Sequence, residues 1–239
     1  MEKKFNLNQD HRAVNITIPI ILVVLIVIGY RVFYLTLPSI FGGRSGDYIL
    51  IAGIISLFVS AFLMWLLDPL IKYFLPSGQI LSLNSEKGAL TYFEQEEAKT
   101  LLDGRPDWQI TRWTFKMGRF VKSGRERQIP RNWWCVALMV KAEGKELTLF
   151  CYASPRTKRT FDQQASWEEI SMYDTIEDDS RSRNLPLMRP PTVADVIPGK
   201  LLVGDKGHVW LAERKRRENG MEMSAKDFGE LLSYLAGGQ

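Results

Sequence analysis

Apolar and polar positions divide the chain into two unlike parts. Near the N-terminus lie two uncharged apolar runs, Ala13 to Tyr30 and Tyr48 to Leu67. A hydrocarbon core about 30 Å thick is crossed by about 20 apolar residues in a helix, and both runs meet that length, the first with help from residues 32–35. A soluble helix has a polar face, which both runs lack. The pattern therefore predicts two transmembrane helices rather than two buried core helices.

These helices divide the chain into three predicted regions. A polar N-terminal tail covers residues 1–12, a two-helix transmembrane hairpin covers residues 13–75, and a soluble β-rich domain covers residues 76–239. The first apolar run is longer than the apolar region of a signal peptide, and no small-residue cleavage pattern follows it. We expect it to be a retained anchor.

Basic residues near the runs predict the orientation in the membrane. Lys3, Lys4 and Arg12 precede the first run, and Lys72 follows the second. Basic residues that flank a span favour the cytosolic side. We therefore expect a multi-pass protein of the cytoplasmic membrane with both termini in the cytosol.

Small residues recur every fourth position of the second run, at Ala52, Ser56 and Ser60. Such a stripe allows close packing of helices in a membrane, and the partner is either the first span or a helix of another protein. Neither run carries an ionisable residue in its interior, which favours anchoring over transport.

The remainder of the chain has the alternation typical of antiparallel strands. Strands are predicted at 79–83 and 89–93 around a turn, at 108–121, and at 132–142 and 146–153 around Glu143-Gly144. Residues 94–103 fit a short helix or an irregular insert. The soluble region is therefore predicted to be a mostly antiparallel β domain in a chain of the α+β class.

Two further segments complete the domain. Residues 162–199 are acidic in their first half and proline-rich in their second, and we interpret 161–199 as an extended or partly disordered connector. A second hairpin is predicted from residues 200–203 and 208–213. A C-terminal amphipathic helix follows Ser224, its predicted N-cap, and carries one apolar stripe that includes Phe228 and Leu235.

A layout of several antiparallel strands and one amphipathic C-terminal helix resembles the pleckstrin-homology-like (PH-like) architecture. The segments that carry the resemblance are QILSLNSEKGALTYF, NWWCVALMVKAEGKELTLFCYA and SAKDFGELLSYL. Two spans followed by such a domain look like bacterial membrane proteins with PH-like domains. The resemblance implies an interaction module, and the stretch 162–199 would be a long insert in that plan.

Basic residues are concentrated in one region of the predicted β domain. Residues 105–159 contain 13 basic and four acidic residues. Beside a cytosolic leaflet, basic residues attract anionic headgroups, and the turn with Lys122, Arg125 and Arg127 is the centre of this predicted contact surface. The alternatives are a solvated surface and a surface masked by the acidic stretch. Nucleic acid is a disfavoured ligand, because the chain is membrane-anchored and has no recognised nucleic-acid module.

Trp133 and Trp134 form a second candidate contact site. Adjacent residues of a strand point to opposite faces of the sheet, so one ring is expected in the core. The other would be covered by lipid, by a helix or by a partner, since large exposed aromatic residues anchor many interfaces.

Catalytic chemistry finds no support in the sequence. His11 and His208 are the histidines, and neither has a nucleophile motif near it. Cys135 and Cys151 lie in predicted strands without metal-ligand spacing and are expected to be buried free thiols. The acidic residues of 162–179 lack the spacing of a calcium loop. We expect no enzyme activity, no cofactor and no metal.

These observations lead to three expected functions. The first is a non-catalytic accessory or scaffold subunit of a membrane complex, with membrane-protein partners or further copies of itself. The second is a module that senses anionic lipid. The third is an oligomeric pore-forming effector.

Overall fold

The computed structural model describes residues 2–8, 12–75, 77–94, 97–102, 108–118, 126, 128–177 and 192–236 of the 239-residue chain. Its fold is of the α+β class, as predicted. The chain forms two compact units. One unit is Asn8–Ser77, and the other combines Met1–Leu7 with Gly78–Gln239.

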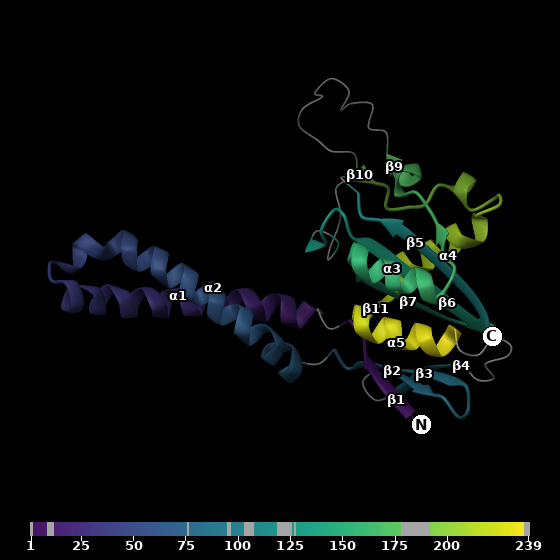
Figure 1. Ribbon diagram of the computed structural model, residues 1–239, viewed down its shortest axis with the longest axis horizontal. Helices are drawn as coiled ribbons and strands as arrows, with labels where there is room; N and C mark the ends of the chain where they lie inside the picture. The colour runs from purple at the N-terminus through teal and green to yellow at the C-terminus, as the bar shows by residue number, and fades with distance from the viewer. Residues whose placement is uncertain are drawn as a thin grey trace, which may run out of the picture. The chain divides into compact units, whose positions relative to one another are not determined.

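The first unit is a helical hairpin. It consists of α1 (Arg12–Phe41), a short 3₁₀ turn (η1, Ser45–Tyr48) and α2 (Ile49–Phe74), and the two helices run side by side (Figure 1). Both helices extend beyond the predicted apolar runs. Ile16–Phe41 and Gly46–Ile71 are long and apolar enough to cross a membrane, by length and composition.

Four antiparallel strands form the first sheet of the other unit. They are neighbours in chain order: β1 (Glu2–Asn6), β2 (Gln79–Asn84), β3 (Ala89–Glu94) and β4 (Glu97–Leu102). Strand β4 replaces the helix or irregular insert expected at 94–103.

Strand β1 corrects the predicted polar tail. Residues 2–6 pair antiparallel with β2, in register from Glu2 with Asn84 to Asn6 with Ile80. The physical reason is burial of two apolar side chains, because Phe5 and Leu7 enter the core. Most residues of this stretch are charged or carry amide groups, so the sequence shows no clear alternation of apolar and polar positions that would predict the strand.

The second sheet has an antiparallel centre and two parallel edges. Its order is β11-β7-β6-β5-β8, and these strands are β5 (Gln109–Lys116), β6 (Trp134–Ala142), β7 (Lys145–Ala153), β8 (Glu168–Glu169) and β11 (Met221–Glu222). The predicted hairpin of β6 and β7 is confirmed. Its turn places Glu143 and Gly144 at positive φ of 49° and 77°, a backbone conformation that glycine adopts without penalty.

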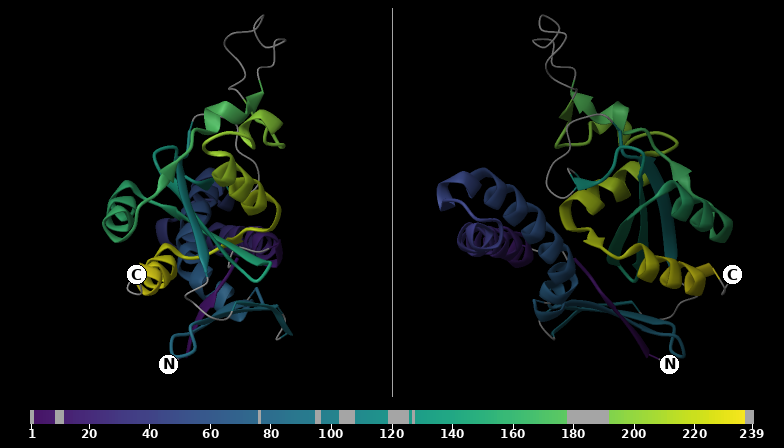
Figure 2. Two further views of the ribbon diagram at one scale, coloured as in Figure 1. Left: turned by 90° about the vertical axis from the view of Figure 1, so that its right-hand side faces the viewer. Right: turned by 60° about the vertical axis from the view of Figure 1, so that its left-hand side comes forward.

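Helices cover both faces of this second sheet. Figure 2 shows α4 (Gly207–Asn219) on one face, and α3 (Pro155–Gln164) and α5 (Ala225–Ala236) on the other. One apolar core joins α3 and α5 to both sheets, and the other lies under α4. Because neighbouring residues of a strand face opposite ways, Val136 belongs to the first core and Cys135 to the second.

The connector predicted at 161–199 is wrong for the part of it that the structure describes. Helix α3 extends to Gln164, and a 3₁₀ turn (η4, Met172–Thr175) and a small pair of strands, β9 (Ile176–Glu177) and β10 (Thr192–Val193), follow. The stretch folds because apolar side chains interrupt its acidic residues. Ile170, Met172 and Ile197 are buried in the second core. Residues 178–191 lie outside the described part.

The hairpin predicted at 200–213 is also wrong. A 3₁₀ turn (η6, Gly199–Leu201) leads into α4, which begins at Gly207. Val209, Trp210 and Ala212 are buried together with Glu213 and Arg216, a spacing of three and four residues that belongs to a helix. The sequence pattern missed it because the buried stripe contains two charged residues.

The C-terminal helix is confirmed, together with its cap. The backbone N–H of Asp227 donates to Ser224 Oγ over 3.1 Å. Met223 and Phe228, on either side of the cap, both lie in the first core, as expected for a hydrophobic staple.

Candidate functional site

The small-residue stripe of α2 lies against α1. Ala52, Ser56 and Ser60 have exposed fractions of 0%, 0% and 2%. Ser56 Oγ donates to the carbonyl oxygen of Ile26 over 3.0 Å, and a Cβ built on Gly29 would lie 3.4 Å from Ser56 Cβ. Of the two partners left open by the sequence, the stripe therefore contacts the first helix of its own hairpin.

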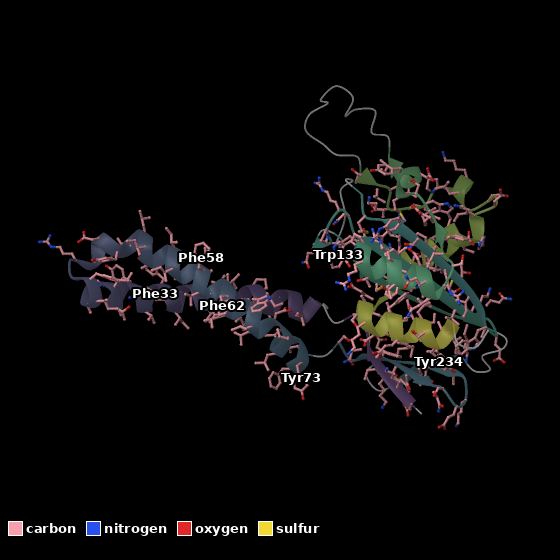
Figure 3. The ribbon with its side chains drawn as sticks, in the orientation of Figure 1. Phe33, Phe58, Phe62, Tyr73, Trp133 and Tyr234 are labelled. Atoms are coloured by element: carbon pink, nitrogen blue, oxygen red, sulfur yellow. The ribbon has the colours of Figure 1, made fainter. Side chains whose placement is uncertain are left out.

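Large apolar side chains cover the outer surface of α2. Phe58, Phe62 and Tyr73 are exposed along the helix (Figure 3). The exposed apolar side chains of α2 therefore lie on this surface and not on the small-residue stripe.

Three residues form the centre of the predicted basic contact surface. Lys122, Arg125 and Arg127 lie outside the described residues. Nearby basic residues that are described, such as Lys116 and Arg131, are exposed.

The two adjacent tryptophans point to opposite faces, as predicted. Trp133 packs against the core under α4, and Trp134 packs against the core under α3 and α5. Both rings are half-buried. Lys158 of α3 lies over the Trp134 ring, with Nζ 5.3 Å from its centroid, and forms an ion pair with Asp162. Trp134 is thus covered by a helix of its own domain.

A buried cluster of charges on α4 is the site that the sequence pattern missed. Glu213 has an exposed fraction of 0% and Arg216 of 7%. Arg216 donates from Nε to Glu213 Oε2 over 2.8 Å and from a terminal nitrogen to Oε1 over 2.9 Å. Trp113 of β5 donates its indole N–H to Glu213 Oε2 over 2.9 Å. The sequence did contain one indication of this cluster. Glu213 is followed directly by four basic residues, RKRR, and a carboxylate next to several basic side chains can form ion pairs with them.

Arg217 extends the cluster to the segment between β8 and α4. It donates to Glu213 Oε1 over 3.1 Å and to the carbonyl oxygen of Ala194 over 2.7 Å. The Arg216 guanidinium also lies over the rings of Phe115 and Phe150, with centroid distances of 5.3 and 4.9 Å. Such stacking is favourable for a desolvated guanidinium.

Electrostatics keeps the cluster ionised. Burial would raise the pKa of the Glu213 carboxyl, but Arg216, Arg217 and the Trp113 N–H outweigh it, and the pKa lies below its ordinary value. Burial works against the charged form of Arg216 as well, but Glu213 raises its pKa well above the ordinary value. Because both oxygens of Glu213 already accept hydrogen bonds from these donors, the cluster is suited to fixing α4 on the sheet rather than to proton transfer.

The cysteines are buried free thiols, as expected. They belong to different cores, Cys135 under α4 and Cys151 on the opposite face. Burial raises the pKa of both thiols, which suppresses the reactive thiolate.

Arg112 of β5 differs from the arginines of α4. Its Nε is buried and has no hydrogen-bond partner, and burial lowers the pKa of its guanidinium without an opposing carboxylate. Within the described part of the chain no carboxylate forms an ion pair with it. Orphaned polar groups of this kind are uncommon in folded proteins.

Glu168 of β8 has a histidine as its partner. Glu168 Oε1 lies 2.9 Å from His208 Nε2. Among the described residues, no group of three or more histidine, cysteine, aspartate and glutamate side chains could hold a metal ion.

The fold and these sites define a class: an α+β domain, mostly antiparallel in its sheets, that carries two long apolar helices near its N-terminus. Comparison with family models, curated proteins and solved structures found no match.

Proposed function

We propose that the protein is a non-catalytic, membrane-anchored accessory or scaffold subunit whose domain binds a partner protein. The observation that carries the proposal is the place of the hairpin in the domain. Helices α1 and α2 lie in the chain between β1 and β2, which are neighbouring strands of one sheet.

This connection constrains the topology in a membrane. Strands β1 and β2 pair over five residues, so the chain before α1 and the chain after α2 belong on one side of the bilayer. Residues 7–11 and 75–78 make the two connections. With Lys3 and Lys4 in β1, the preference of basic residues for the cytosol supports a cytosolic domain and cytosolic termini.

The order of elements supports the PH-like interpretation. Strands β1 to β4 form one antiparallel sheet, β5 to β7 follow as a second antiparallel set, and α5 packs on the core between them. The segment from α3 to β11 is then an insert between the last of these strands and the C-terminal helix. Because PH-like domains commonly serve as interaction modules, this resemblance favours binding.

Exposed apolar side chains give further support. Outside the hairpin, the large apolar residues that are exposed in the described part are Tyr173, Val196, Val203 and Leu211. All four come from the insert. Where exposed apolar side chains gather into a patch, they mark an interaction site, and we propose that the insert contributes such side chains to partner binding.

Mild detergent extraction of the native protein, followed by size analysis and mass spectrometry, tests this proposal. We expect a companion protein that co-migrates reproducibly at a fixed stoichiometry. A chain that migrates alone, or only with copies of itself, would contradict the accessory-subunit function.

An anionic-lipid contact is the second candidate, because residues 105–159 carry 13 basic and four acidic residues. It predicts that neutralising Lys122, Arg125 and Arg127 weakens binding of the domain to phosphatidylserine vesicles, and that salt weakens it as well. Unchanged vesicle binding by the triple variant would exclude this surface.

A further inference from the structure

Two kinds of arginine occur in the domain. The guanidinium groups of Arg216 and Arg217 are paired with Glu213. Arg112 is half-buried but has no such partner among the described residues, and its Nε lacks any hydrogen bond. Partial burial of a guanidinium without a counter-charge is unfavourable, and an anion from outside the domain would relieve it.

The strand edge beside Arg112 is incomplete. Strand β8 pairs with β5 at Trp113 and Thr114, and no other described strand lies on that side of β5. The start of β5, from Gln109 to Thr111, therefore has no described strand on that side.

The direction of the backbone shows which N–H and C=O groups of β5 point toward this edge. Ile170 donates its N–H to the carbonyl oxygen of Thr114 over 3.0 Å, so the peptide groups of Thr114 point toward the edge. Because this direction alternates along a strand, the peptide groups of Arg112 and Ile110 point there too. Beyond the end of β8, the N–H and C=O of Ile110 face a side of β5 on which no described strand lies.

The described side chains beside Arg112 do not supply it with a counter-charge. The parallel register of Trp113 with Glu168 places Trp167 beside Arg112. Glu168 shares the face of Trp113, where it binds His208. Trp167 stacks on Phe228 at a centroid distance of 6.3 Å and is half-buried, so it forms an apolar wall.

We infer that Arg112 and the open edge of β5 bind an extended, carboxylate-bearing segment of a partner protein. This inference rests on the proposed function and specifies the chemistry of the partner. An added strand would satisfy the backbone groups of Ile110, and a Glu or Asp side chain would pair with the planar guanidinium in a bidentate manner. A phospholipid headgroup would satisfy the guanidinium but not the peptide groups of the edge.

A matched pair of peptides tests the inference. The full-length chain, labelled with ¹⁵N-arginine in phosphatidylcholine nanodiscs, is titrated with acetyl-Val-Thr-Glu-Val-Thr-amide and with the same peptide carrying Gln in place of Glu. We expect the Arg112 Nε–H signal to move with the Glu peptide, and this peptide to bind about tenfold more tightly than the Gln peptide, as a charge-assisted bidentate pair would provide.

Variants at the site separate charge from fold. Arg112→Gln should abolish the preference for the Glu peptide, Arg112→Lys should keep part of it, and Arg156→Gln, an exposed arginine on α3, should leave it unchanged. Equal binding of the two peptides to the native chain would overturn the inference, and that comparison needs no variant to fold. Movement of the signal with phosphatidylserine nanodiscs but not with peptide would overturn it in favour of a lipid.

The native complex distinguishes the two proposals. Loss of the co-migrating companion in Arg112→Gln, but not in Arg156→Gln, supports both. A companion that stays bound to Arg112→Gln overturns the inference and leaves the accessory function in place. A native chain without any companion contradicts the proposed function itself.

Discussion

Glu213 illustrates how single residues organise the domain. It lies on α4 beside four basic residues in the sequence, and it is the most enclosed carboxylate of the buried charge cluster. Its hydrogen bonds join three parts of the fold: α4 itself, Trp113 of β5, and through Arg217 the backbone at Ala194. Residues 208–213 were predicted to be a strand, and a strand at this place gave no reason to expect a buried carboxylate. The sequence pattern therefore did not reveal this site.

Replacing Glu213 with Gln should destabilise the domain strongly. The substitution removes the nearer carboxylate of the buried Arg216 guanidinium and leaves it with Glu126, whose Oε1 lies 3.3 Å from an Arg216 nitrogen. Breaking a buried pair of this kind costs about 3–5 kcal/mol. Unfolding by guanidinium chloride, followed by tryptophan fluorescence in mild detergent, measures the loss. Glu218→Gln removes an exposed carboxylate from the same helix, where it pairs with Arg214, and should change the midpoint little. Equal effects of the two variants would contradict the structural role of the cluster.

Acid should weaken the domain through the same residue. The pKa of Glu213 in the folded chain lies below its ordinary value, whereas the pKa of a glutamate in an unfolded chain is about 4.3. The stability it contributes is therefore present above about pH 4.3 and is lost as the pH falls through the lower folded pKa. Unfolding midpoints measured from neutral pH to about pH 2.5 should fall more steeply for the native chain than for Glu213→Gln. Parallel profiles would mean that Glu213 does not titrate as described.

At the scale of elements, the strongest local patterns were predicted correctly. The two apolar helices, the turn of β6 and β7 and the cap of α5 each follow from a few neighbouring residues. Strand β1 and helix α4 do not, because their stability comes from distant contacts. Phe5 and Leu7 bury only after the chain has passed through the hairpin, and Glu213 is tolerated on α4 only because Arg216 and Trp113 meet it.

The hairpin offers an element-scale prediction with a matched control. Gly29→Leu should destabilise the pair of helices by about 1–3 kcal/mol, the usual range for overpacking, because a Cβ at Gly29 already lies 3.4 Å from Ser56 Cβ. Gly53→Leu makes the same change on α2 where nothing lies within 4 Å of the added Cβ. The midpoint of dodecyl-sulfate-induced loss of helical circular dichroism should fall for the first variant alone. Equal midpoints would contradict the packing of α1 on the small-residue stripe.

At the scale of the whole molecule, the chain builds one domain from two separated pieces. The strand before the helical hairpin completes the sheet that begins after it. The sequence predicted the two long apolar helices and the antiparallel domain, but it treated residues 1–12 as a tail. A pairing between residues about eighty positions apart has no periodic signal in a single sequence, so only the structure could reveal it.

The most direct test of this account is a disulfide between β1 and β2 in the full-length chain. Lys4 and Ser82 are paired residues, and opposed residues of antiparallel strands have Cα atoms about 4.5–5.5 Å apart, within disulfide range. Lys4→Cys with Ser82→Cys should form a cross-link on mild oxidation, detected as one linked peptide by mass spectrometry. Lys4→Cys with Lys87→Cys, in the turn beyond β2, should not. Efficient linkage of the first pair alone is the predicted result, and its absence in a folded chain would contradict the pairing of β1 with β2.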